Sequence, residues 1–163
     1  MSLSRRDSGF TLIEIMVVVA LVSLMSALGA GAYKSWAAAH AQLGAATDMQ
    51  TILRQTQVRA VTEGVPFCVK FDTTAETYTV YRHACDTAAT IPLVKVNGPL
   101  SLGDSHVAMT GVQFHAPDGS VGAQMTFRAS GSAWPGGLTI ARSGSSKTYS
   151  IAVEGLTGRV SLS

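Results

Sequence analysis

An uncharged apolar run near the start of the chain is the feature that most constrains its fold. Residues 15–33 carry no charged side chain, and residues 10–13 extend the apolar stretch toward the N-terminus. A bilayer-spanning helix needs about 20 predominantly apolar residues, whereas the apolar core of a secretory signal has about 7–15. The run therefore predicts a membrane-spanning helix. The small residues 29–32, which include an A-x-A triplet, leave ordinary signal cleavage as the alternative.

The residues that flank this run predict its orientation. Arg5 and Arg6 precede it, and basic residues next to a membrane-spanning helix remain on the cytoplasmic side. Tyr33 and Trp36 lie at the other end, where aromatic side chains commonly anchor a helix at the outer interface. We therefore expect a single-pass protein of the inner (cytoplasmic) membrane, with a cytoplasmic N-terminus and a periplasmic or extracellular C-terminal domain.

Glu14 is the residue that does not fit a simple anchor. Its carboxylate lies near the start of the apolar stretch, where a charge is costly unless it is paired. One interpretation places Glu14 at the headgroup boundary, solvated by water. The other pairs it with a cation that a neighbouring chain supplies.

Residues 9–14, with the sequence GFTLIE, resemble the prepilin peptidase motif of type IV pilins and type II secretion pseudopilins. A short basic leader precedes this motif and an uncharged run follows it, as in that family. The resemblance implies that prepilin peptidase cleaves between Gly9 and Phe10 and that Phe10 is N-methylated. It also implies that Glu14 neutralises the terminal amine of an adjacent subunit during assembly. An amine and a carboxylate attract each other strongly in a bundle of low dielectric constant.

The next segment, residues 34–63, predicts a helix that continues the first. It contains no proline and only Gly44 as a glycine, and good helix formers dominate it. A stripe of apolar residues at three- and four-residue steps predicts its buried face: Leu43, Ala46, Met49 and Leu53, continued by Ala60 or Val61. From residue 10 to about residue 62 the helix would be roughly 80 Å long. Gly64 and Pro66 are expected to end it.

From residue 67 the hydrophobic periodicity changes to two, which is typical of β-strands. The predicted strands cover residues 67–71, 78–81, 91–96, 106–115, 121–127, 138–142, 149–154 and 159–162. Turn signals separate them, among them residues 97–99 and 134–137. The fold class is therefore α+β: a long N-terminal helix followed by an antiparallel β-sheet or β-sandwich domain. The predicted divisions are a leader at 1–9, a membrane or filament-core helix at 10–33, an amphipathic continuation at 34–63 and a β domain at 64–163.

Two further segments resemble the GspH/FimT group of minor pseudopilins and minor pilins. They are residues 58–66, which lead directly into a strand, and the ending IAVEGLTGRV at residues 151–160. The resemblance implies a structural subunit that initiates or caps a type II secretion pseudopilus or a type IV pilus, and no enzyme activity. The implied partners are prepilin peptidase, other pilins or pseudopilins and an inner-membrane assembly platform.

Two alternatives stay open within this class: a major pilin and a minor pilin that binds DNA. DNA-binding members of the group end in Gly-Arg-x-Arg, whereas this chain has Arg159 but Ser161 at the second arginine position. Arg142 and Lys147 add local positive charge, yet the formal net charge of the whole chain is only +2. Each phosphate contact contributes separately to affinity, so we expect no DNA binding and a solvated Arg159.

Cys68 and Cys85 are the cysteines of the chain. Outside the cytoplasm such a pair normally oxidises, so we expect a disulfide beside the first two strands, with reduced thiols in the core as the alternative. His83 and Cys85 have no second ligand pair at zinc spacing, so we expect neither a metal nor a cofactor. Motifs of hydrolases and phosphate-binding loops do not occur, which argues against an enzyme.

Overall fold

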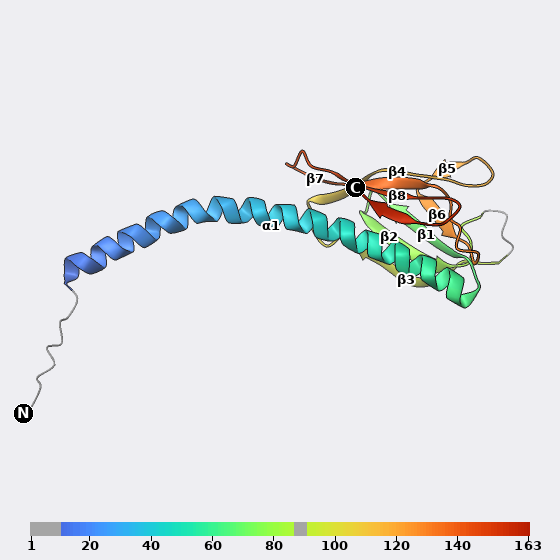
Figure 1. The fold of residues 1–163 in the computed structure, drawn as a ribbon, viewed down its shortest axis with the longest axis horizontal. Coiled ribbons are helices and arrows are strands. Elements are labelled where there is room, and N and C mark those ends of the chain that lie inside the picture. Colours follow the sequence, from blue (N-terminus) through green and yellow to red (C-terminus); the bar gives the residue numbers. More distant parts are fainter. Residues whose placement is uncertain (1–10, 87–90) are drawn as a thin grey trace, which may run out of the picture. The chain divides into compact units, whose positions relative to one another are not determined.

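The computed structural model describes residues 11–86 and 91–163 of the chain. Its first element is the helix α1, Leu12–Glu63 (Figure 1). The chain divides into two compact units, residues 1–39 and 40–163, and α1 contributes to both. The second unit contains the rest of α1 and every β-strand in the described part of the chain.

Local sequence accounts for both ends of α1. At its start the backbone amide of Glu14 donates to the carbonyl and the hydroxyl oxygen of Thr11, at 3.1 and 3.3 Å, so Thr11 is the N-cap. At its end Gly64 adopts a φ of 66°, the left-handed conformation that glycine allows after a helix. The prediction that α1 ends near Gly64 is therefore confirmed.

The expected membrane-spanning segment at residues 10–33 receives no support from the structure. Over the residues that the structure describes, no helix is both long and apolar enough for a membrane crossing.

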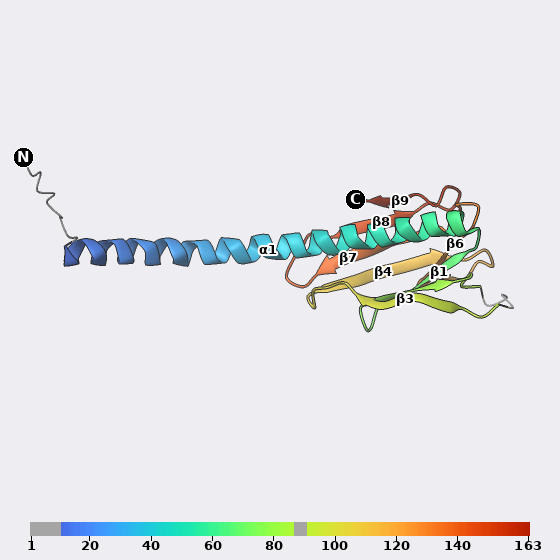
Figure 2. The ribbon, with the colours of Figure 1, turned by 90° about the horizontal axis from the view of Figure 1, so that it is seen from below.

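The strands form two antiparallel sheets. Sheet A has the order β3-β2-β1-β6, and sheet B has the order β5-β4-β7-β8-β9. The bounds are β1 Phe67–Asp72, β2 Thr77–Arg82, β3 Val94–Ser101, β4 Val107–His115, β5 Val121–Gly122, β6 Gln124–Phe127, β7 Gly136–Arg142, β8 Tyr149–Val153 and β9 Val160–Leu162. In Figure 2 the second half of α1 runs beside β8, and β3 lies on the far side of the domain from it.

Most predicted strands are found, and the differences involve glycine and proline. Gly98 and Pro99 were expected in a turn, but β3 continues through both to Ser101, with irregular pairing to β2. Likewise Gly136 begins β7 instead of belonging to the preceding turn. The single strand expected at residues 121–127 is two strands, because β5 pairs with β4 in sheet B and β6 pairs with β1 in sheet A.

The core lies where α1 meets the two sheets. Met49 and Leu53 of α1 are fully buried in it, as the apolar stripe predicts. Leu43 is an exception, since its side chain is 39% exposed, and Gln42 is buried in its place. Ala60 rather than Val61 continues the stripe, because Ala60 is buried and Val61 is 49% exposed.

Polar side chains of α1 bind the backbone of sheet B and thereby explain why Gln42 is buried. The Gln42 amide donates to the carbonyl oxygens of Ile140, at 3.2 Å, and Lys147, at 2.6 Å. Arg54 donates to the carbonyl oxygen of Val160 on β9, at 3.0 Å. Because β9 is an edge strand of sheet B, α1 partly satisfies backbone groups that the sheet leaves unpaired.

Candidate functional site

Glu14 lies in the first turn of α1 and its side chain is exposed. Thr11 and Glu14 have the Thr-x-x-Glu spacing of a capping box, in which the glutamate favours the helix start. A carboxylate is also favoured there by the positive end of the helix dipole. The sequence already contains this signal. Glu14 therefore favours the start of α1, in addition to the expected solvation at the headgroup boundary or pairing with a cation of a neighbouring chain. An exposed first-turn carboxylate remains accessible to a partner.

Gly9 and Phe10, the predicted cleavage residues, lie outside the described residues. Cleavage between them and methylation of Phe10 stay predictions.

The expected disulfide is present between Cys68 and Cys85, whose Cα atoms are 5.1 Å apart. Cys68 lies on β1, and Cys85 follows β2 in the connection toward β3. Trp134 from the β6–β7 connection is buried against the two cysteines, and Tyr81 and Leu93 pack around this small cluster. The backbone amide of Cys85 also donates to the hydroxyl oxygen of Thr126 on β6, at 2.9 Å. The disulfide thus holds the start of the β2–β3 connection across the outer face of sheet A.

Arg159 belongs to the connection between β8 and β9 and is engaged within its own turn. Its guanidinium donates to the Glu154 carboxylate at 3.0 Å, and both side chains are at least half exposed. The same carboxylate accepts a hydrogen bond from the Thr157 hydroxyl at 3.0 Å, and the Arg159 amide donates to that hydroxyl at 3.2 Å. Arg159 is therefore solvated, as expected, but its charge is already opposed by Glu154.

Gly158 explains part of the TGRV ending in structural terms. It adopts a φ of 62°, and a Cβ atom there would stand 2.6 Å from the Gln57 amide nitrogen and collide with the carbonyl oxygen of Gly131. Gln57 bridges the two connections, since its amide donates to Gly131 at 3.2 Å and to Thr157 at 2.8 Å. The glycine is therefore required by close packing of the β8–β9 turn against α1 and the β6–β7 connection.

The other basic residues considered for DNA contact do not join Arg159. Arg142 is the last residue of β7, and its guanidinium pairs with the Asp104 carboxylate at 3.4 Å. Arg159 lies near the other end of β7, because the next residue, Val160, pairs with Val153, and Val153 pairs with Gly136, the first residue of β7. Six residues of extended strand separate those ends, or roughly 20 Å. Lys147 places its ammonium 4.9 Å from the centre of the Tyr149 ring. The three cations therefore form no continuous basic patch.

Other titratable groups serve structure. The backbone amide of His106 donates to Asp104, and this bond, with the nearby Arg142 guanidinium, lowers the pKa of the Asp104 carboxyl. Burial, and then the Asp48 carboxylate, raise the pKa of Tyr78. Within residues 11–86 and 91–163, no group of three histidine, cysteine or acidic side chains could hold a metal ion.

Comparison with protein families identifies the class that this fold defines. A family model described as "Type II transport protein GspH" matches residues 45–157, and one described as "Prokaryotic N-terminal methylation motif" matches residues 4–30. The first match covers more than half of the chain, so the protein belongs to the GspH family of minor pseudopilins and minor pilins. Members of this family are structural subunits and not enzymes. No curated protein matches the sequence significantly.

Solved structures share the fold at low sequence identity. The minor pseudopilin EpsH of the type II secretion system of Vibrio cholerae is 15% identical, with a TM-score of 0.57, over 78% of this chain and 97% of EpsH. The solution structure of Escherichia coli GspH is 17% identical, with a TM-score of 0.53, over 77% of this chain and 90% of that one. The type IV minor pilin FimU of Pseudomonas aeruginosa is 15% identical, with a TM-score of 0.49, over 73% of this chain and 85% of FimU. The TM-scores of EpsH and GspH exceed 0.5, so the α+β fold predicted from the sequence is the pseudopilin fold.

Proposed function

We propose that this chain is a minor subunit that initiates or caps a type II secretion pseudopilus or a type IV pilus. The observation that carries the proposal is the combination of two family matches on one chain. A methylation motif covers residues 4–30, a GspH domain covers residues 45–157, and α1 runs from within the first match into the second. A subunit of a helical filament needs both parts: a helix to pack in the filament and a folded domain to make specific contacts.

The chemistry of the proposed assembly step involves an amine and a carboxylate. Cleavage between Gly9 and Phe10 frees an α-amine at Phe10, and methylation of that amine keeps it basic. In an assembled bundle this cation would lie close to Glu14 of the neighbouring subunit. Each charge would be costly alone in an apolar bundle, and the pair offsets part of that cost. The exposure of Glu14 in the first turn of α1 supports this role.

The proposal names partners and a location. Prepilin peptidase processes the chain, other pilins or pseudopilins pack against its helix, and an inner-membrane platform drives assembly. The N-terminus starts in the cytoplasm and the β domain lies outside it, as Arg5, Arg6 and the disulfide suggest. The disulfide supports this location because such bonds persist in oxidising compartments.

Mass spectrometry of the chain from the membranes of its own host tests the processing step. We expect an N-terminal peptide that begins at Phe10 and carries one additional methyl group. A strain that lacks prepilin peptidase is the control and should yield the chain with residues 1–9 attached. An N-terminus created beyond residue 29 in the normal strain would mean ordinary signal cleavage and would contradict the proposal.

A further inference from the structure

The outer face of sheet A carries a trough that the proposed function does not use. It has a volume of about 530 Å³ and lies over β1, β2 and β3. Val69 and Phe71 of β1 point into the core, so Lys70 between them points to the outer face. Thr79 of β2 pairs with Lys70, and Tyr81 of β2 pairs with Lys95 of β3. Short threonine side chains thus form the floor, and longer lysine side chains rise on both sides.

Tyr81 lies at the positively charged end of the trough, beside Lys70 and Lys95. One part of the tyrosine packs against the buried cluster of the disulfide and Trp134. The Lys70 ammonium lies 5.6 Å from the centre of the Tyr81 ring, and Lys95 faces the same tyrosine from the neighbouring strand. Two adjacent strand spacings, about 10 Å, separate the backbones of β1 and β3. The Lys70 ammonium therefore lies near the Tyr81 ring, and Lys95 is paired with the same tyrosine on the neighbouring strand.

These two lysines differ from most of the arginines of the same domain. Arg59, Arg82, Arg142 and Arg159 all pair with carboxylates of the chain itself. Across residues 11–86 and 91–163, by contrast, neither Lys70 nor Lys95 has an ion pair with a carboxylate. Among the described residues that line the trough, the two lysines outnumber one aspartate, Asp72, so the trough keeps a net positive charge that favours an anionic partner.

The opposite end of the trough limits what that anion can be. Asp72 lines this end, where its carboxylate accepts hydrogen bonds from the amides of Thr74 and Ala75, both at 2.9 Å. A polyanion such as nucleic acid would bring phosphates close to this fixed negative charge. An isolated carboxylate avoids that repulsion, and it matches the two ammonium groups.

We propose that the trough binds an acidic side chain of a neighbouring pilin or pseudopilin, whose carboxylate lies between Lys70 and Lys95 beside Tyr81. This inference rests on the proposed function, because it assumes that the chain assembles with other subunits. The trough is available for such a contact, since it is formed by β1–β3 and β3 lies away from α1 (Figure 2).

A carbodiimide that couples amines directly to carboxylates tests the contact, because it joins only groups that already touch. The full chain is produced with its own assembly system, treated in intact cells, and its cross-links are mapped by mass spectrometry. We expect an amide between Lys70 or Lys95 and one defined aspartate or glutamate of another subunit. The Lys70→Gln/Lys95→Gln double variant should abolish the amides at these two positions, because glutamine has neither the amine that the carbodiimide couples nor the charge that binds a carboxylate. Lys147→Gln, in the connection between β7 and β8, is the matched control and should leave the yield of these amides unchanged.

Charge exchange then decides between a functional contact and mere proximity. Lys95→Glu should reduce co-purification with the cross-linked subunit, and reversal of that subunit's acidic residue to lysine should restore it. Absence of an intersubunit cross-link at Lys70 and Lys95, while the chain is still found in filaments, would overturn this inference and leave the proposed function intact. Salt-sensitive DNA retention by the full chain that the double variant abolishes would also overturn it, because the trough would then hold a polyanion.

Discussion

The two halves of α1 differ in the exposure of their large apolar side chains. In the first unit Leu21 is 52% exposed and Met25 is 72% exposed, whereas in the second unit Met49 is 1% exposed and Leu53 is fully buried. The second half finds its apolar partners in the sheets of its own chain. The first half exposes nearly continuous apolar surface, and patches of that size mark interaction surfaces. The helix is thus a folding element at one end and, in our proposal, an assembly element at the other.

Truncation of one leucine in each half of α1 separates these two roles and should include the largest of the expected effects. Leu53→Ala leaves a cavity in the core and should reduce the free energy of unfolding by about 2–5 kcal/mol. Leu21→Ala removes the same atoms from an exposed position and should change it by no more than about 0.5 kcal/mol. Denaturant unfolding of the full chain in detergent measures both. Equal losses for the two variants would mean that the first half of α1 contributes to folding of the β domain.

Removal of the disulfide should have the next largest effect. A bond that closes a loop of this length contributes about 3 kcal/mol in the loop-entropy model, and Cys68 and Cys85 are 17 residues apart. The Cys68→Ser/Cys85→Ser double variant should therefore unfold at lower denaturant concentration than the oxidised chain. Reduction of the unaltered chain should reproduce most of the loss. If neither treatment changes the midpoint, the cluster around Trp134 stabilises this face of sheet A without the bond.

The smallest of the three stability effects concerns the TGRV ending. Gly158→Ala should cost about 1–3 kcal/mol, because the position has a positive φ and no space for a Cβ atom. Gly144→Ala is the control, since Gly144 also has a positive φ, 79°, but nothing lies within 4 Å of its added Cβ. The difference between the two losses of unfolding free energy measures the cost of the close contact at residue 158, because both positions share the strain of a positive φ. Identical losses would show that the contact with Gln57 and Gly131 is not what requires a glycine at residue 158.

Most of the fold could be predicted from the sequence because the hydrophobic period changes from helical to alternating just after Pro66. The errors occur where tertiary contacts outweigh local signals. Gln42 is buried although it is polar, since carbonyl oxygens of Ile140 and Lys147 accept its hydrogen bonds. Gly98 and Pro99 lie in β3 because this edge strand tolerates irregular pairing with β2. Neither contact has a signal in the sequence near the residue.

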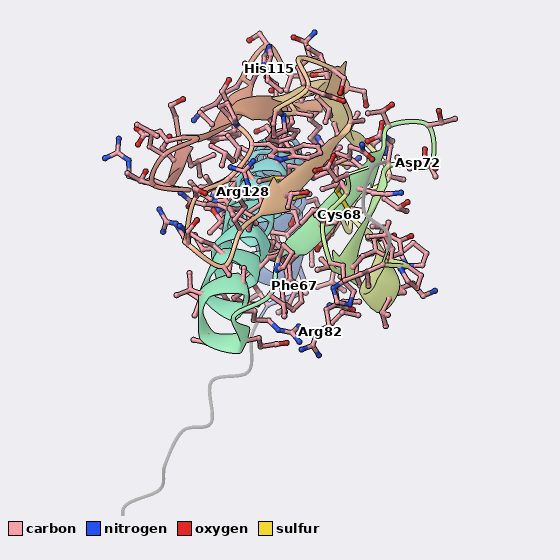
Figure 3. The ribbon with its side chains drawn as sticks, turned by 90° about the vertical axis from the view of Figure 1, so that its right-hand side faces the viewer. Phe67, Cys68, Asp72, Arg82, His115 and Arg128 are labelled. Carbon is pink, nitrogen blue, oxygen red and sulfur yellow. A yellow bond between two sulfur atoms is a disulfide. The ribbon has the colours of Figure 1, made fainter. Side chains whose placement is uncertain are left out.

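The candidate site was predicted unevenly for the same reason. The disulfide followed from the number of cysteines and the expected compartment, and it is present. The roles of Arg159 and Gly158 could not be foreseen, because Arg159 pairs with Glu154 within a turn and Gly158 packs against Gln57 of α1. Figure 3 shows the end of the domain at which α1 ends. At that end the labelled Arg82 lies near the end of α1, and its guanidinium pairs with Glu63 at 3.5 Å. Such pairs across elements are visible only in the folded chain.

Incorporation of a Glu14→Ala variant into filaments tests the central claim most directly, because Glu14 lies in the half of α1 that we assign to assembly. Filaments are sheared from cells that produce the variant as their sole copy of the chain, and the subunit is quantified by immunoblotting. We expect the variant to be missing from filaments while its β domain unfolds at the same denaturant concentration as the unaltered chain. Asp48→Ala, an exposed carboxylate in the other half of the helix, should still be incorporated. Normal incorporation of Glu14→Ala would contradict the account.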